Sequence, residues 1–170
     1  MKELNLPNVT LIALITSCFI QFGAQLFALT IIASTVAEAP PRSFAMFQGE
    51  YGYNSSAFWS TVPPITFLLL LIALITNWKT RRRKLLLFAL TLFIIGGLVA
   101  GFYLEPMFAD MIAKGYSDKV DPTLQKQAAR WYAIDWIVWG HGVVAGLALL
   151  LALIRPVTTL QHTPNMAPDI

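Results

Sequence analysis

Four long apolar stretches, separated by short polar segments, dominate the hydrophobic pattern of this chain. We place them at about residues 9–34, 58–78, 85–104 and 131–154. Each has about the 20 helical residues that cross a hydrocarbon core about 30 Å thick. Lipid offers no partners to backbone N–H and C=O groups, and four spans cannot close a barrel, so each stretch is predicted to be a helix. The pattern therefore predicts an all-α, integral membrane four-helix bundle.

The hairpin between the second and third stretches, residues 79–84, is strongly basic. It contains Lys79, Arg81, Arg82, Arg83 and Lys84. Basic residues in short loops favour the cytoplasmic side, which places both termini in the cytoplasm and residues 35–57 and 105–130 in outer loops. We expect one four-span domain over residues 1–155, followed by a flexible C-terminal tail at 156–170 that includes His162. The expected location is a cell membrane crossed several times, with a bacterial inner membrane favoured.

Local signals predict how the two outer loops are built. Residues 105–114 have the pattern of a short amphipathic helix that ends at Gly115. Asp121 is suited to cap the fourth helix and Pro122 to begin it, so this helix is expected to start above the membrane. The other loop, residues 35–57, is rich in aromatic residues and glycine and is predicted to lie along the membrane interface.

Composition supports a membrane protein and argues against a nucleic-acid partner. The chain is 56% hydrophobic and 12% charged, with a mean hydropathy of +0.63, whereas about a quarter of the residues in soluble domains are charged. The net charge of +3 comes mostly from the basic hairpin, which is a topology signal. Cys18 is the single cysteine and is expected to be a packed apolar residue.

Glycines spaced four residues apart occur in two of the predicted helices. Gly97 and Gly101 lie in the third helix, and Gly142 and Gly146 lie in the fourth. Such spacing lets helix backbones approach closely in a membrane. We expect these faces to mediate close packing, within the bundle or with a membrane-protein partner or a second copy of the chain.

Polar residues inside the spans are the candidate site, because such groups normally face the bundle interior. Glu105 and Asp135 lie near the outer boundary, His141 lies deeper, and Gln25 falls at about the depth of His141. Gln21 is four residues from Gln25 and shares its face of the first helix. Together they predict a polar track that leads inward from the outer surface.

Asp135 and His141 are six residues apart, which puts them about 120° apart around the helix. They therefore cannot both point at one partner. Asp135 shares its face with Trp139 and with the two glycines of the fourth helix. The alternative for Asp135 is an interfacial carboxylate neutralised by Arg130, Arg42 or a lipid headgroup, and for His141 it is a neutral ring bonded across a helix interface.

We predict a binding pocket in the outward-facing half of the bundle for an apolar small molecule or a membrane lipid. If the protein is an enzyme, the favoured chemistry is a cofactor-free, oxygenase-like or isomerase-like reaction with His141 as base. The alternative is a non-enzymatic accessory or scaffold subunit of a membrane complex. No metal or cofactor is predicted, since paired Glu-x-x-His motifs, Cys-x-x-Cys and phosphate-binding loops are all absent from the sequence. The predicted catalytic residues are His141 and Asp135, and the predicted ligand-binding residues are Gln21, Gln25, Glu105, Trp139 and Arg42.

Two short stretches resemble a known family. "EPMFADMI" places a proline where the third helix leaves the membrane, and "RWYAIDWIVWGHG" places a tryptophan and a histidine early in the fourth. In these features the chain resembles small bacterial four-span membrane proteins of the anthrone oxygenase-like family of unknown function. The resemblance carries over Pro106, Trp139 and His141, whereas Val144 stands where the family typically has an arginine.

Overall fold

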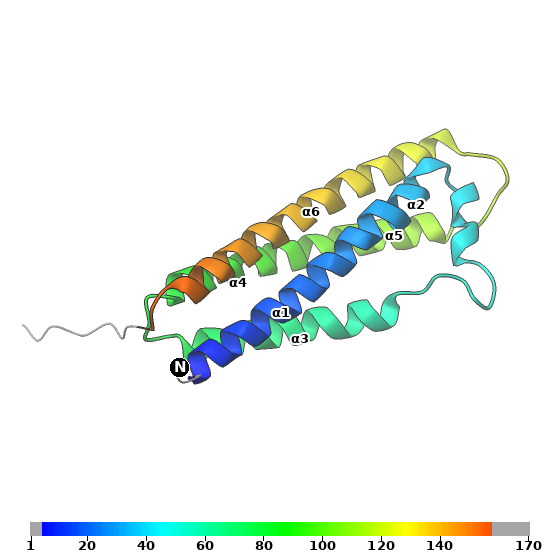
Figure 1. Cartoon of the computed structure of the whole chain (residues 1–170). Coiled ribbons are helices and arrows are strands. Elements are labelled where there is room, and N and C mark those ends of the chain that lie inside the picture. Colours follow the sequence, from blue (N-terminus) through cyan, green and yellow to red (C-terminus); the bar gives the residue numbers. More distant parts are fainter. Residues whose placement is uncertain (1–4, 158–170) are drawn as a thin grey trace, which may run out of the picture.

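The computed structural model describes residues 5–157, which form an elongated bundle of long helices (Figure 1). Four of the helical segments are long and apolar enough to cross a membrane, as predicted: Leu6–Glu38, Ser56–Thr76, Arg83–Ile112 and Pro122–Ile154. Within residues 5–157 there is no β-strand. The predicted tail, with His162, lies almost wholly outside the described residues.

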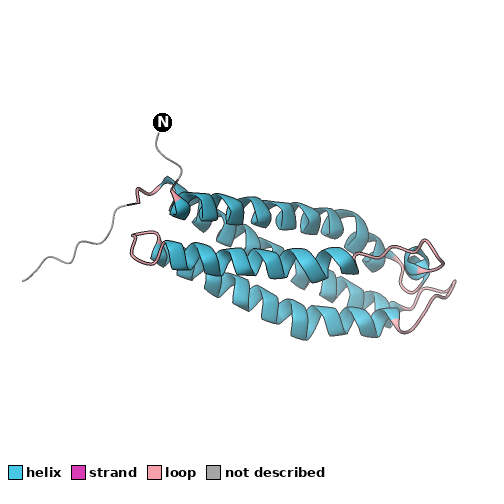
Figure 2. Ribbon diagram, turned by 90° about the horizontal axis from the view of Figure 1, so that it is seen from below, coloured by secondary structure: helices cyan, strands magenta, loops and turns pink. Residues whose placement is uncertain are grey.

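Figure 2 shows the same four segments side by side, with the connecting loops gathered at the two ends of the bundle. The start of the first helix, the turn at residues 77–82 and the end of the last helix lie together at one end, here called the hairpin end (Figure 1). Residues 39–55 and 113–121 lie at the opposite end, here called the long-loop end.

Two of the four segments contain a π-helical turn where an α-helix was predicted to end or to leave the membrane. The first segment runs through α1 (Leu6–Phe27), the π-helical η1 (Ala28–Ala33) and α2 (Ser34–Glu38). The third runs through α4 (Arg83–Val99), the π-helical η3 (Ala100–Leu104) and α5 (Glu105–Ile112). The amphipathic helix predicted after residue 104 is thus a continuation of α4. Pro106 has no backbone N–H to donate and would normally interrupt a helix. The π-helical turn before it changes which carbonyl the following N–H groups bond to, so the helix continues past the proline.

The other two segments are uninterrupted α-helices. α3 (Ser56–Thr76) contains Pro63 and Pro64 in its first half. α6 (Pro122–Ile154) begins as predicted, because the Asp121 side chain accepts hydrogen bonds from the backbone N–H groups of Thr123 and Leu124. Gly115 has a φ of +72°, a left-handed conformation that glycine adopts without steric cost, at the chain reversal between α5 and α6.

Buried apolar residues form two clusters, one toward each end of the bundle. The larger cluster joins all four long segments and includes Leu14, Cys18, Leu70 and Leu149. On its α1–α3 side, hydroxyl groups pair across the helices, Ser17 with Thr66 at 2.7 Å and Thr10 with Thr76 at 2.9 Å.

The smaller cluster lies at the long-loop end. There the short helix η2 (Arg42–Phe47) inserts Phe44 among Val36, Met111, Leu124 and Ala128. The loop predicted to lie along the membrane interface therefore caps this end of the bundle.

Arg82 in the basic hairpin closes the hairpin end. Its side chain is only 3% exposed. Its guanidinium donates to the carbonyl of Arg155 at 2.6 and 2.9 Å, to the carbonyl of Leu153 at 3.1 Å and to Oδ1 of Asn8 at 2.6 Å. The planar guanidinium can satisfy several acceptors at once, here the last carbonyls of α6 and the first turn of α1.

Replacing Arg82 with alanine is expected to destabilise the fold by about 2–3 kcal/mol, because buried acceptors that were bonded to a cation lose their donor. Unfolding in detergent, followed by circular dichroism, measures the change. Arg81→Ala is the matched control, since Arg81 is exposed in the same turn. Equal losses in the two variants would contradict a specific role for Arg82.

Candidate functional site

Where α1 meets α6, the Phe22 ring lies over two glycines. A Cβ atom added to Gly142 would lie 2.8 Å from Cε1 of Phe22, and one added to Gly146 would lie 2.8 Å from Cε2. Beside the ring, Nε1 of Trp139 donates a hydrogen bond to the carbonyl of Phe22 at 3.2 Å. The prediction that this face of the fourth helix mediates close packing is confirmed.

Among the described residues, the glycine face of the third helix makes no such contact, and its use by a partner or a second copy of the chain stays a prediction. A Cβ atom added to Gly97 or Gly101 would meet nothing within 4 Å. α4 turns a neighbouring face toward α6, where a Cβ on Gly96 would lie 3.9 Å from Cγ1 of Val138. The spacing of small residues shows only that close approach is allowed, and the larger side chains around them decide which face is used.

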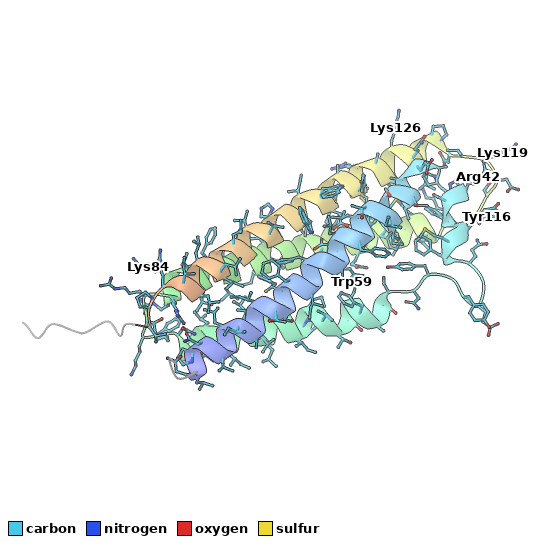
Figure 3. All side chains as sticks on the ribbon, in the orientation of Figure 1. Arg42, Trp59, Lys84, Tyr116, Lys119 and Lys126 are labelled. Carbon is cyan, nitrogen blue, oxygen red and sulfur yellow. The ribbon has the colours of Figure 1, made fainter. Side chains whose placement is uncertain are left out.

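Asp135 is held by an amide and not by a basic residue. Nε2 of Gln25 donates to Oδ1 of Asp135 at 3.1 Å, so the structure brings these two predicted site residues together. The predicted alternative, neutralisation by Arg130 or Arg42, is not met. The Arg130 guanidinium lies 5.8 Å from the centre of the Tyr103 ring, and Arg42 lies near Tyr116 at the long-loop end (Figure 3).

Between the four helices lies a cavity of about 670 Å³, here called the apolar cavity. Most of its lining is aliphatic, aromatic or glycine, and α1, α3, α4 and α6 all contribute. Gln21, Gln25 and His141 are its polar side chains, and Gly97 forms part of its wall. Three of the polar residues predicted from the sequence therefore face one space.

A second cavity, of about 630 Å³, lies toward the long-loop end and is here called the polar cavity. Gln25, Glu105 and Asp135 line it, together with residues of both π-helical turns, Ala28 and Leu104 among them. A π turn widens a helix locally and redirects its side chains, which makes room at this level of the bundle. The two cavities adjoin, because Gln25, Trp59 and Ala100 line both, and Figure 3 shows Trp59 beside the start of α3.

His141 has a defined orientation. Its Nδ1 lies 2.9 Å from the carbonyl oxygen of Ile137, one turn earlier in α6. A carbonyl only accepts hydrogen bonds, so Nδ1 is the donor in this contact and Nε2 is the other ring nitrogen. The predicted alternative of a bond across a helix interface is wrong, since the bond stays within α6. Because His141 lines the apolar cavity and Asp135 the polar one, the two predicted catalytic residues do not share a cavity.

Each cavity is lined by a residue with a buried polar atom that has no partner. Oε1 of Gln21 and Nε1 of Trp131 are both buried without a hydrogen bond, and the remaining case among the described residues is Oδ1 of Asn77 in the hairpin turn. The sequence suggests Gln21 as a site residue, but it favours a membrane-interface role for Trp131. Only the surrounding structure shows that the Trp131 N–H is buried without a hydrogen-bond partner in the protein.

The remaining predicted site residues have different surroundings. Glu105 is exposed and lines the polar cavity. Trp139 and Arg42 line neither cavity, and Trp139 instead stabilises the α1–α6 contact. Among the described residues, no group of three or more His, Cys, Asp or Glu side chains is placed to hold a metal ion.

Comparisons with protein-family models, curated proteins and solved structures found no match to this chain. The resemblance to the anthrone oxygenase-like family therefore stays a prediction.

Gly146→Ala is expected to destabilise the protein by about 1–3 kcal/mol, because the new methyl group overpacks the α1–α6 contact. The Phe22 ring lies over both glycines, and its Cε2 atom would be only 2.8 Å from the new Cβ, so the ring must shift. Gly140→Ala is the control, since its Cβ would meet nothing within 4 Å on the same helix. The measurement is the melting temperature in detergent. In the background Phe22→Leu, the cost of Gly146→Ala should shrink, and an unchanged cost would show that the ring is not the obstacle.

Proposed function

We propose that this protein is a membrane-spanning binding protein for a lipophilic molecule with one polar end. The observation that carries the proposal is that an apolar cavity of about 670 Å³ and a polar cavity of about 630 Å³ lie in one bundle and share Gln25, Trp59 and Ala100 as lining residues. Small-molecule sites combine mostly apolar walls with a few placed polar groups. The apolar cavity suits a hydrocarbon or ring system, and the polar cavity suits a headgroup.

The polar atoms of the apolar cavity support a ligand that also carries a hydrogen-bond donor. Oε1 of Gln21 is buried without a partner, and Nε2 of His141 can accept a hydrogen bond whenever the ring is neutral. A buried acceptor without a donor costs about 1–3 kcal/mol, so a ligand hydroxyl or amine placed there would recover part of that cost. If the bound molecule reacts, Nε2 of His141 is the group placed to accept its proton.

The route of entry follows from the position of the apolar cavity. Phe67 on α3 and Ile94 and Leu98 on α4 line it and are also exposed on the outside of the bundle. In a membrane these side chains would contact lipid tails. A lipophilic molecule would thus reach the cavity from the bilayer, between α3 and α4.

The scaffold alternative needs glycine faces that are free to contact a partner, and one of the two predicted faces is not free. Gly142 and Gly146 are covered by Phe22 of the same chain and are not free to contact a partner. Gly97 and Gly101 remain uncovered on α4. A binding function accounts for both cavities and their polar side chains, whereas an accessory role accounts only for the uncovered glycines.

The orientation that goes with this proposal places the hairpin end in the cytoplasm of a bacterial cell, with the protein in the inner membrane. Lys79, Arg81 and Lys84 are exposed at that end, and Figure 3 shows Lys84 opposite Lys119 and Lys126. Cytoplasmic loops carry an excess of basic residues. The two cavities would then lie in the outward-facing part of the bundle.

Single cysteines test the orientation. In a Cys18→Ser background, Lys119→Cys should react with a membrane-impermeant maleimide on intact cells, and Lys79→Cys should react only after permeabilisation, because both positions are exposed at opposite ends. Labelling is measured by a mass shift on gels. The reverse pattern would overturn the proposed orientation.

Filling the apolar cavity tests binding. Gly97 lines the cavity, and a Cβ atom there would meet nothing within 4 Å, so Gly97→Leu is expected to fill part of the cavity and to lower the amount of co-purifying lipophilic molecule by about tenfold or more. Mass spectrometry of organic extracts from the purified protein measures it. Gly101→Leu is the matched control, since it lies one turn on, is equally open and lines neither cavity. Equal ligand content in the two variants and the parent would contradict the proposal.

A further inference from the structure

The polar cavity has walls of an unusual kind, because aromatic rings and carboxylates make up most of its functional groups. Two acidic residues, Glu105 and Asp135, line it, and none of its described lining residues is basic. Five aromatic residues share the lining: Phe47, Tyr53, Trp59, Phe108 and Trp131. The cavity thus joins two sources of negative potential, carboxylates and aromatic ring faces.

Four of the five rings form one continuous wall. Phe108 and Trp131 are stacked with their centres 5.1 Å apart, and Phe47 meets Phe108 edge to face at 5.6 Å. Tyr53 continues the series from Phe47 at 6.1 Å. Aromatic faces attract organic cations, with about 2 kcal/mol or more for a desolvated contact. A wall of this kind is the usual surround of an ammonium group.

Among residues 5–157, neither carboxylate forms an ion pair with a basic side chain. Asp135 accepts one hydrogen bond, from the neutral amide of Gln25, and the nearest basic residue on its helix, Arg130, faces Tyr103. Carboxylates inside a membrane-spanning bundle normally have a partner of opposite charge.

We infer that the polar end of the bound molecule is a cation, an amine or quaternary ammonium that sits in the polar cavity while the rest of the molecule fills the apolar one. This inference rests on the proposed function and names the chemical class of its ligand. An anionic headgroup would be repelled by Glu105 and Asp135. For a bare metal ion the cavity offers two carboxylates, and among the described residues no group of three or more His, Cys, Asp or Glu side chains is placed to hold one.

A pair of probes that differ in charge tests the inference. Decyltrimethylammonium and decyldimethylamine N-oxide have the same chain, but at neutral pH only the first carries a net charge. Isothermal titration calorimetry with the protein in dodecyl maltoside should give a Kd about tenfold or more lower for the ammonium, the size expected of a desolvated cation–aromatic contact. The double variant Glu105→Gln, Asp135→Asn should lose this preference.

The control variants separate the charge effect from damage to the fold. Glu105→Gln alone changes an exposed side chain and should weaken the ammonium without affecting the melting temperature. Asp110→Asn removes another exposed carboxylate of α5 that does not line the cavity, and it should leave both Kd values unchanged. Equal affinity for the two probes in the parent, or a preference that survives in the double variant, would overturn the inference.

The outcomes also distinguish this inference from the proposed function. If both probes bind equally and Gly97→Leu weakens both, the cavities bind a lipophilic molecule but do not select a cation. If neither probe binds, both proposals fail. Competition against bound decyltrimethylammonium identifies the source of the cation. Displacement of this probe by a short-chain phosphatidylcholine but not by phosphatidylglycerol indicates a lipid headgroup. Displacement by neither lipid indicates a free lipophilic amine.

Discussion

The contact between Phe22 and the two glycines of α6 determines how the rest of the bundle is arranged. Helices surrounded by lipid gain little from apolar burial alone, so their association depends on close packing and buried hydrogen bonds. Here both occur together, because the ring lies against Gly142 and Gly146 while the Trp139 N–H bonds to the carbonyl of Phe22. One turn further toward the long-loop end, the same alignment places Gln25 opposite Asp135.

The apolar cavity begins at that contact, because Phe22 and Gly142 line it, and the polar cavity lies beyond it toward the long-loop end. Two of the four long segments that line the polar cavity contain a π-helical turn at this level, η1 in the first and η3 in the third. α3 contributes Trp59, Pro63 and Pro64 to the apolar cavity from its first half. Its second half is tied to α1 through hydroxyl pairs at Thr66 and Thr76. The bundle is therefore tightly joined toward the hairpin end and hollow in its other half.

The buried polar groups also differ between the hairpin end and the half that contains the cavities. Arg82 at the hairpin end finds all its acceptors within the chain, so it stabilises the fold. Gln21 and Trp131 line the cavities, and each has a buried polar atom without a partner. A satisfied buried charge needs nothing further, whereas an unsatisfied buried group is most simply completed by a ligand. This contrast is the physical basis for placing a binding site in the hollow half.

The sequence by itself determined the number and helical nature of the spans, the start of α6 at Asp121 and the packing face of Gly142 and Gly146. These features depend on hydropathy and local geometry, which are properties of neighbouring residues. Tertiary structure alone decided that Gln25 and not Arg130 bonds Asp135, that His141 faces a separate cavity and that Gly97 is open. Each of these depends on how far helices distant in sequence are rotated about their axes, and side-chain packing between helices sets that rotation.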